Sequence, residues 1–396
     1  SFMFSRIVNY VDFKSIDSSI KYLSISAFFT GIGLGYFFTL IVIIAKYKGY
    51  SEGSIGIIAS CFGLGLVSAG LFVSNILDKI GLYKTMLLAI SIQTICVILM
   101  FVFFNPINLA VNHLIMGIFG GMNWMTMDTW VNIVSDNKNR GKAIGLYNSA
   151  ISIGFALGPL FVGLFGVNGF FPIILAISLM AIRTPAIIII KKHVESVKIP
   201  RLKKKFNFSL FKIAPFIFLA IFIGGANDTT FGALFAAYMI NELFSDKTIG
   251  YLYFVGAFGG VISQPFIGAL TDKINKRNFI IILLTLHLIW PILLNNFVFI
   301  NTILFFSVII WGVASVSLYT VALAYLGERV KISELAIYTS FFIIIYESGG
   351  FLGPIIVGQS MNSFGNEGFI YSIIIFTFIP ILLGIIRSII KKNYEI

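Results

Sequence analysis

Long apolar segments are the feature that most constrains this 396-residue sequence. Each is about 20 residues long, and a helix of that length rises enough to cross a hydrocarbon core of about 30 Å. The runs are continuous and do not alternate in hydropathy as lipid-facing barrel strands would. We expect an all-α membrane protein with twelve transmembrane helices, which lie near residues 22–45, 53–74, 83–104, 107–133, 142–165, 169–190, 213–239, 247–270, 278–299, 301–326, 335–359 and 369–390.

The composition and charge agree with this prediction. Only 11% of the residues are charged, whereas soluble domains carry about 25%, so a water-soluble fold is excluded. The net charge of +12 could suggest nucleic acid in a soluble protein. Here 24 of the 28 Lys and Arg residues fall on the side of the predicted termini, three fall on the other side, and Arg183 lies within a span. The positive-inside rule therefore predicts a multi-pass protein of the cytoplasmic (inner) membrane with both termini in the cytoplasm and no nucleic-acid partner.

Two unrelated motifs recur at nearly the same offset. Asp78-Lys79 and Asp272-Lys273 are 194 positions apart, and the prolines Pro159 and Pro354, each in the pattern G-x-x-x-G-P-x-x-x-G, are 195 apart. The sequence therefore predicts two parallel six-helix repeats with a binding site between them.

The repeat divides the chain into five predicted parts. They are a cytoplasmic segment at 1–21, a six-helix bundle at 22–190, a basic linker at 191–212, a second six-helix bundle at 213–390 and a tail at 391–396. The linker contains KIPRLKKK. Its charge is consistent with a solvated connection or with contact to anionic membrane lipid.

The loop after the second and eighth spans carries a family resemblance. Residues 268–277 read GALTDKINKR, and residues 74–84 read SNILDKIGLYK. Both resemble the signature loop G-x-x-x-D-[RK]-x-G-[RK]-[RK] of the major facilitator superfamily, although the first copy lacks the basic pair. The segments SQPFIGALTDK and SLYTVALAYLGERV, with the stretch from Trp124 to Asp128, resemble the bacterial YcaD-like branch of that superfamily.

The resemblance implies a fold of two pseudo-symmetric six-helix bundles and a transporter, not an enzyme, without a cofactor or metal. It also implies that the signature loops act as conformational latches. The latch residues would be Asp78, Lys79, Gly81, Asp272, Lys273 and Arg277. The Gly-Pro elements could bend as the halves rock, since proline interrupts helix hydrogen bonding; their residues are Gly154, Gly158, Pro159, Gly349, Gly353 and Pro354.

Ionisable residues within spans are the site candidates, because each costs about 2.5–3.5 kcal/mol at the centre of a membrane helix. Asp228 follows Asn227 in GGANDTTFG, in the seventh span, which lines the cavity in the resembling family. Glu347 lies in YESGG, six residues before Gly353. We expect a substrate or proton role for this pair. The alternatives are a structural hydrogen-bond hub at Asp228 and a neutral group at a helix kink for Glu347.

Asp128 and His113 share the fourth span. They are 15 residues apart, about 22 Å along a helix, so they cannot touch each other but could be successive stations of a proton path. Arg183 could extend to the headgroups or serve as a counter-ion for a substrate carboxylate. Further candidates for the cavity wall are Tyr36, Trp124, Gln264 and Tyr319.

The sequence favours a monomeric secondary transporter that moves a small organic solute by rocker-switch alternating access. The predicted coupling is to protons, as in a symporter. Two alternatives stay open, which are multidrug or metabolite efflux by proton antiport and a non-transporting receptor or scaffold. The charge of the solute is also open, because three buried acids favour a cation or zwitterion, whereas Arg183 would favour a carboxylate.

Overall fold

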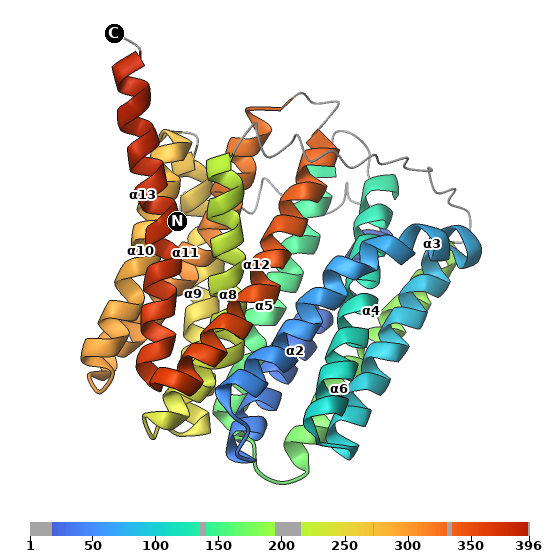
Figure 1. The fold of residues 1–396 in the computed structure, drawn as a ribbon. Coiled ribbons are helices and arrows are strands. Elements are labelled where there is room, and N and C mark those ends of the chain that lie inside the picture. Colours follow the sequence, from blue (N-terminus) through green and yellow to red (C-terminus); the bar gives the residue numbers. More distant parts are fainter. Residues whose placement is uncertain (1–17, 135–139, 195–214, 272, 331–334, 395–396) are drawn as a thin grey trace, which may run out of the picture.

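The computed structural model describes residues 18–134, 140–194, 215–271, 273–330 and 335–394, and helices dominate these residues (Figure 1). The N-terminal half comprises α2 (Ser18–Tyr47), α3 (Glu52–Val102), α4 (Pro106–Val134), α5 (Arg140–Phe165), α6 (Phe171–Ala181) and α7 (Arg183–Val194). The C-terminal half comprises α8 (Pro215–Asn241), α9 (Asp246–Thr271), α10 (Lys276–Phe297), α11 (Asn301–Gly327), α12 (Leu335–Phe364) and α13 (Asn366–Tyr394). The predicted linker lies mostly outside the described residues.

Two helical elements do not correspond one-to-one with spans. The long α3 contains two apolar spans, Glu52–Gly70 and Asn75–Val102, and bends at Gly81, whose φ of 77° is unfavourable for other residues. Helices α6 and α7 instead form one span, Phe171–Lys191, which is interrupted at Ile182.

Eleven segments of the described chain are long and apolar enough to cross a membrane. The remaining long helix, α4, is interrupted by polar residues that include Asn112, His113, Asn123 and Asp128. With α4 as the twelfth span, the predicted all-α membrane fold with two six-helix halves is confirmed.

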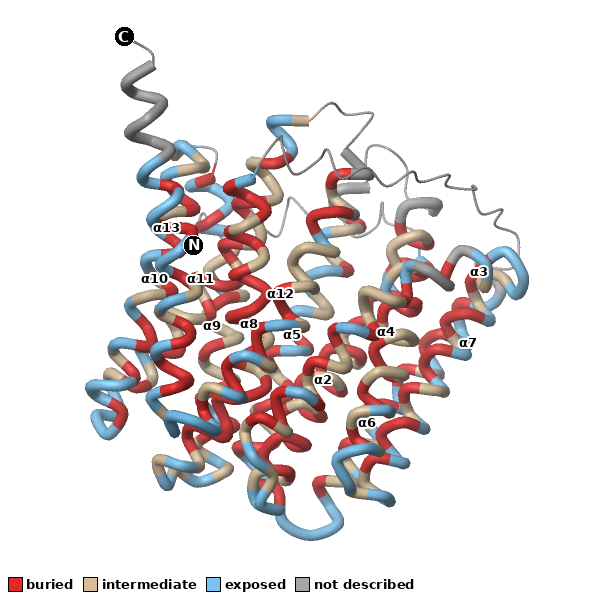
Figure 2. The backbone as a smooth tube through the Cα atoms, viewed as in Figure 1, coloured by how far each residue is buried: buried red, intermediate tan, exposed pale blue. Residues whose placement is uncertain are grey.

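The first helix of each half is the most enclosed. In the most apolar part of α2 and of α8, 72% of the residues are buried, against 44% or less in the other spans. Figure 2 shows this burial along both helices. The two equivalent helices therefore lie centrally, where they can position side chains between the halves.

Close helix contacts at glycines repeat in the two halves. Gly154 and Gly158 of α5 lie against the backbone of α2, and Gly349 and Gly353 of α12 lie against the backbone of α8. A side chain at any of these positions would collide with the facing helix, so the small residues permit the contact. Both helices also continue through their prolines, Pro159 and Pro354.

The halves contact each other most closely where α2, α8 and α12 end and α3, α9 and α13 begin, which we call the closed end. Among the described residues, three hydrogen bonds join the halves at this end. Asn241 Nδ2 donates to Glu52 Oε1 at 2.9 Å, Gly53 N donates to Asn362 Oδ1 at 3.0 Å, and Val167 N donates to Asp246 Oδ2 at 2.9 Å.

Away from the closed end, the halves separate. Gly56 of α3 lies directly against the carbonyl of Pro354, a side chain at Gly63 would make ordinary contact with Phe351, and Gly70 faces only Met125 of its own half. The apolar packing follows the same trend. One cluster of buried residues joins both halves and includes Tyr36, Phe231 and Val357, while two other clusters each belong to a single half.

Candidate functional site

Four polar side chains of the C-terminal half form a connected group, here the C-terminal cluster of Asp228, Tyr319, Tyr346 and Glu347. The Tyr346 hydroxyl donates a 2.5 Å hydrogen bond to Asp228 Oδ2. The rings of Tyr319 and Tyr346 meet edge to face with centroids 5.2 Å apart. Asp228 also lies within electrostatic range of Glu347. All four residues are only partly buried, so the cluster borders open space.

A close helix contact positions this cluster. Gly225 of α8 lies against the backbone carbonyl of Tyr346 on α12, and Asp228 follows almost one helical turn later. A side chain at position 225 would push the helices apart and lengthen the Tyr346–Asp228 hydrogen bond. The glycines that pack α8 on α12 therefore also bring together the two acids that the sequence singled out.

Gln264 extends the polar surface from α9. Thr320 Oγ1 donates to Gln264 Oε1 at 2.8 Å, and Thr320 follows Tyr319 on α11. The Gln264 Nε2 group is buried and has no hydrogen-bond partner within the described residues. Of the predicted wall residues, Tyr319 therefore lies near the acids, and Gln264 bonds the residue that follows Tyr319 on α11.

Asp128 brings an acid from the N-terminal half. Its carboxyl interacts with the indole of Trp124, one turn earlier on α4, and the Trp124 side chain is 47% exposed. Tyr319 lies within electrostatic range of both Asp128 and Glu347. Acids from the two halves therefore approach the same aromatic side chain across the interface.

Asn227 faces away from this group. It is completely buried, and its Nδ2 donates to Thr377 Oγ1 on α13 at 2.9 Å. Adjacent residues of a helix point in directions about 100° apart, which explains why Asp228 can meet Tyr346 while Asn227 ties α8 to α13.

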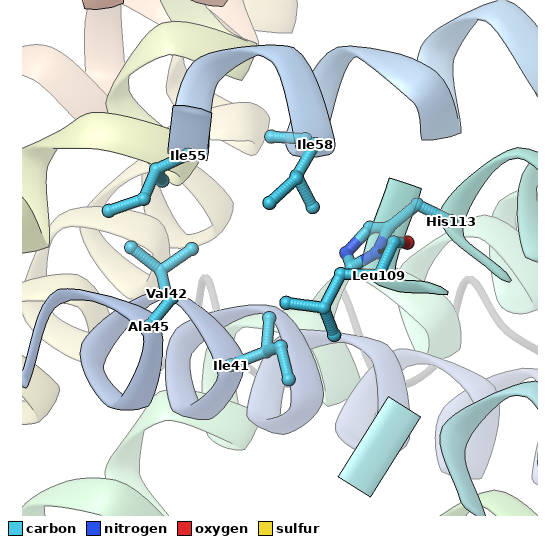
Figure 3. Close-up of a pocket in the computed structure, with 8 residues that line it drawn as sticks. Ile41, Val42, Ala45, Ile55, Ile58, Leu109 and His113 are labelled. Carbon is cyan, nitrogen blue, oxygen red and sulfur yellow. Dashed lines mark hydrogen bonds between the residues drawn. The ribbon is translucent and has the colours of Figure 1, made fainter. Parts of the chain in front are cut away.

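His113 lies inside the N-terminal half. Its Nδ1 bonds with the Leu109 carbonyl at 2.8 Å, and its ring packs against the rings of Phe37 and Phe38. A cavity of about 20 Å³ adjoins the ring and is otherwise lined by apolar side chains (Figure 3). Such a volume is close to that required by one water molecule. The structure keeps this residue apart from the C-terminal cluster.

Arg183 and Tyr36 are also enclosed in the N-terminal half. Arg183 has no exposed surface, and its Nε donates to the Met180 carbonyl at 2.9 Å. The two terminal nitrogens have no hydrogen-bond partner within the described residues. Tyr36 donates to the Pro172 carbonyl at 3.2 Å and is completely buried.

The described residues of the signature loops are exposed or make bonds within their own half. Asp78, Lys79 and Lys273 are exposed, and Asp272 lies outside the described residues. Arg277 Nη2 donates to the Gly384 carbonyl on α13 at 2.6 Å. Its guanidinium also lies over the Phe216 ring, so this residue ties helices of its own half together.

Tyr346, which donates the hydrogen bond to Asp228, was not among the predicted site residues. A signal was available, since Tyr346 directly precedes Glu347 in YESGG. Because tyrosines are common in this chain, only the contact with Asp228 distinguishes Tyr346 from the other tyrosines.

A sequence comparison identifies the family of this two-half, twelve-span protein. The family model for the Major Facilitator Superfamily matches residues 23–216 and again residues 217–392. The chain belongs to the major facilitator superfamily. The two matches follow the internal repeat, and the protein is a membrane transporter of this family, not an enzyme.

Three relatives of this major facilitator protein come from two bacteria and an archaeon and are distant in sequence. The uncharacterized MFS-type transporter YfkF of Bacillus subtilis is 24% identical over 87% of this chain and 89% of its own length. An uncharacterized MFS-type transporter of Methanocaldococcus jannaschii is 22% identical over 91% and 97%. The uncharacterized MFS-type transporter YcaD of Escherichia fergusonii is 21% identical over 87% and 89%.

Solved structures show the same fold. The nucleoside transporter NupG has a TM-score of 0.76 and 15% identity, covering 95% of this chain and all of that chain. A bacterial homolog to the human lysosomal transporter Spinster, in an inward-facing and occupied conformation, has a TM-score of 0.71 and 14% identity, with coverages of 93% and 96%. At these identities the likeness concerns the fold alone.

Proposed function

We propose that this protein moves a small organic solute across the cytoplasmic membrane by rocker-switch alternating access coupled to protons. One observation carries the proposal. Asp128 of one half and Glu347 of the other both lie within electrostatic range of Tyr319, and Asp228 lies within electrostatic range of Glu347. A site shared between two halves that contact each other at one end can be exposed first to one side and then to the other.

The distribution of basic residues supports an orientation. Lys46 and Lys247 lie at the closed end, while Lys79, Lys84 and Lys273 lie at the opposite end with most of the other described basic residues. If the positive-inside rule holds, the open end faces the cytoplasm and the closed end faces outward. The described conformation is then the inward-open state of the cycle.

The closed end contains hydrogen bonds between the halves that must break for the opposite state, together with bonds within one half that can persist. Glu52 bonds Lys46 of its own half at 2.5 Å and also accepts from Asn241 of the other half. Asn241 in turn donates to Asn366 Oδ1 at 2.9 Å. These are polar contacts near the end of the bundle, where water can replace each partner.

Proton coupling follows from the cost of a carboxylate in the membrane. An ionised acid there is expensive unless it is paired or protonated. Asp228 can meet this requirement with a proton or with a donor group of the solute, in addition to the Tyr346 hydroxyl. Binding of a proton and binding of the solute at the same carboxyl are therefore energetically linked.

The test is solute uptake by proteoliposomes with an imposed pH gradient, using a solute selected by a thermal-shift screen of metabolites. We expect gradient-driven uptake in the wild type and at least a tenfold lower rate in Asp228→Asn, since a hydrogen bond to a charged group contributes about 1.5–3 kcal/mol. Glu328→Gln is the matched control, because Glu328 pairs with Lys276 outside the cluster. Unchanged uptake in Asp228→Asn would remove this residue from the mechanism.

The same assay separates the two alternatives. Proton antiport would move the solute opposite to the proton flow, so an inward proton gradient would empty preloaded liposomes of the solute, whereas a symporter would fill them. A receptor or scaffold would bind the selected solute and show no flux above that of empty liposomes.

A further inference from the structure

We propose that the closed end is held by two equivalent contacts, one from each repeat, in which Glu52 and Asp246 stabilise the closed arrangement. The α3 contact comprises Glu52 and Gly56, and the α9 contact comprises Asp246 and Gly250. In each contact the acid bonds to the other half, and the glycine one turn later packs on the backbone of the other half. This inference rests on the proposed function, because it describes how access to the same site is controlled.

The first argument is that the repeat places the two acids at equivalent positions. Glu52 and Asp246 are 194 positions apart, which is also the offset of the signature loops. Each lies in the first turn of its helix. The residue before each acid, Ser51 or Ser245, has a hydroxyl that accepts the backbone N–H three residues later. Such capping fixes the start of a helix, so both acids are held in the same local setting.

The second argument is that each acid accepts a hydrogen bond from the other half. Asn241 Nδ2 at the end of α8 donates to Glu52 Oε1, and Val167 N after α5 donates to Asp246 Oδ2, both at 2.9 Å. Tyr47, which lies 194 positions before Asn241 and likewise ends its helix, interacts with Asp246. Hydrogen bonds to ionised groups are stronger than those between neutral groups. Loss of either negative charge should therefore weaken the closed end.

The third argument is the packing one turn after each acid. A side chain at Gly56 would collide with the carbonyl of Pro354, and one at Gly250 would collide with the carbonyl of Pro159 and the nitrogen of Gly163. The two glycines are 194 positions apart and the two prolines 195, so the contacts are counterparts. Helix backbones approach this closely only where the residue between them is small. The Gly-Pro elements therefore also serve as the surfaces on which the opposite half packs.

The experiment measures the distance across the closed end in liposomes without solute. Spin labels are attached to cysteines introduced at Phe170 and Phe299, which are 83% and 73% exposed in loops of opposite halves. The two native cysteines, Cys61 and Cys96, are replaced by alanine. Double electron–electron resonance then gives the ratio of molecules with a long distance to those with a short distance, and a long distance reports an open outer end.

Neutral variants test the acids. We expect Glu52→Gln and Asp246→Asn each to raise the ratio about tenfold, and the double variant about a hundredfold, because hydrogen bonds at separate sites contribute additively. Glu52 also pairs with Lys46 of its own half, so Asn241→Ala is the companion variant that removes only the donor from the other half. It should raise the ratio in the same direction.

An acid without a bond across the halves is the matched control. Glu367 lies in the first turn of α13 at the same end, is exposed and makes no hydrogen bond to the other half among the described residues. Glu367→Gln should change the ratio less than about twofold, as for an ordinary surface substitution. Wild-type distances in a folded double variant of Glu52 and Asp246 would overturn the inference. So would a double-variant shift that one single variant reproduces in full, because only one contact would then hold the closed end.

Glycine variants test the packing. Gly56→Ala and Gly250→Ala each place a methyl group against the backbone of the other half, whereas Gly145→Ala places one where no atom lies within 4 Å. The first two should raise the ratio, and the third should leave it within about twofold of the wild type. Thermal melting shows whether each variant is folded. Wild-type distances in folded Gly56→Ala and Gly250→Ala would remove the packing from the two contacts.

The distance measurement separates this inference from the proposed function, because it uses neither solute nor a pH gradient. If the acid variants shift the distances and the wild type shows no uptake in proteoliposomes, the two contacts stand and the proposed transport fails. If the wild type takes up solute and the acid variants keep the wild-type distances, transport stands and this inference fails.

Discussion

The two halves of the protein repeat their packing but not their chemistry. In the N-terminal half, glycines of α5 pack on α2, and in the C-terminal half, glycines of α12 pack on α8. The polar residues differ. His113 and Arg183 are enclosed in the N-terminal half, whereas Asp228 and Glu347 are partly exposed toward the interface. The shared fold therefore requires the same helix contacts in each half. A site between the halves can nevertheless take most of its polar groups from one half.

The largest effect is expected when the hydroxyl of one tyrosine in each half is removed, since only one of the two tyrosines contacts an acid. Tyr346→Phe removes the hydroxyl that donates to Asp228, and Tyr36→Phe removes one that donates to the Pro172 carbonyl. We expect initial uptake in proteoliposomes to fall about tenfold for Tyr346→Phe, because its partner is a charged group contributing about 1.5–3 kcal/mol. Tyr36→Phe should change uptake less than about twofold. The hydrogen bond that it removes joins two neutral groups and contributes about 1 kcal/mol to the free energy of unfolding, not to binding of the solute. Equal losses in both variants would contradict the difference between the halves.

A smaller effect is expected at Arg183. Its terminal nitrogens have no hydrogen-bond partner within the described residues, and replacing an unpaired buried charge with an apolar side chain is often neutral or stabilising. Arg183→Met should therefore keep or raise the thermal melting temperature and change uptake less than about threefold, well within the range of modest structural substitutions.

Arg183→Lys is the companion variant, because it retains a positive charge and loses the guanidinium geometry. Loss of uptake in Arg183→Met with recovery in Arg183→Lys would show that the charge takes part in the cycle, and the N-terminal half would then contribute to the site.

The smallest effect is expected at His113. The ring is enclosed by Phe37 and Phe38 and is bonded to a backbone carbonyl of its own helix. We expect His113→Gln to leave uptake within about twofold of the wild type and to lower stability by about 1 kcal/mol, as for loss of one neutral hydrogen bond. The measurement is the pH profile of uptake. A profile that shifts or flattens in this variant would place His113 on the proton path, as the sequence had suggested.

Several features of the site could be predicted before the structure, and others could not. Asp228 and Glu347 stand out in the sequence because acids are rare within spans, and the structure brings them into one group. Asn227 shares that sequence context but bonds Thr377 on the other side of α8. Tyr346 carries no such signal, because a tyrosine in a membrane helix is ordinary until its hydroxyl is seen to meet a carboxyl.

The sequence by itself determined the class of fold, the twelve spans and the division into two halves. Each span is decided locally, because a segment of about 20 apolar residues must leave water whatever surrounds it. The tertiary structure alone decided which helix faces meet, which residues share the site and which end is closed. Spans that are apolar on all sides have no periodic stripe to set their rotation, so the contact of Gly225 with the Tyr346 backbone, and with it the position of Asp228, follows from packing between distant segments.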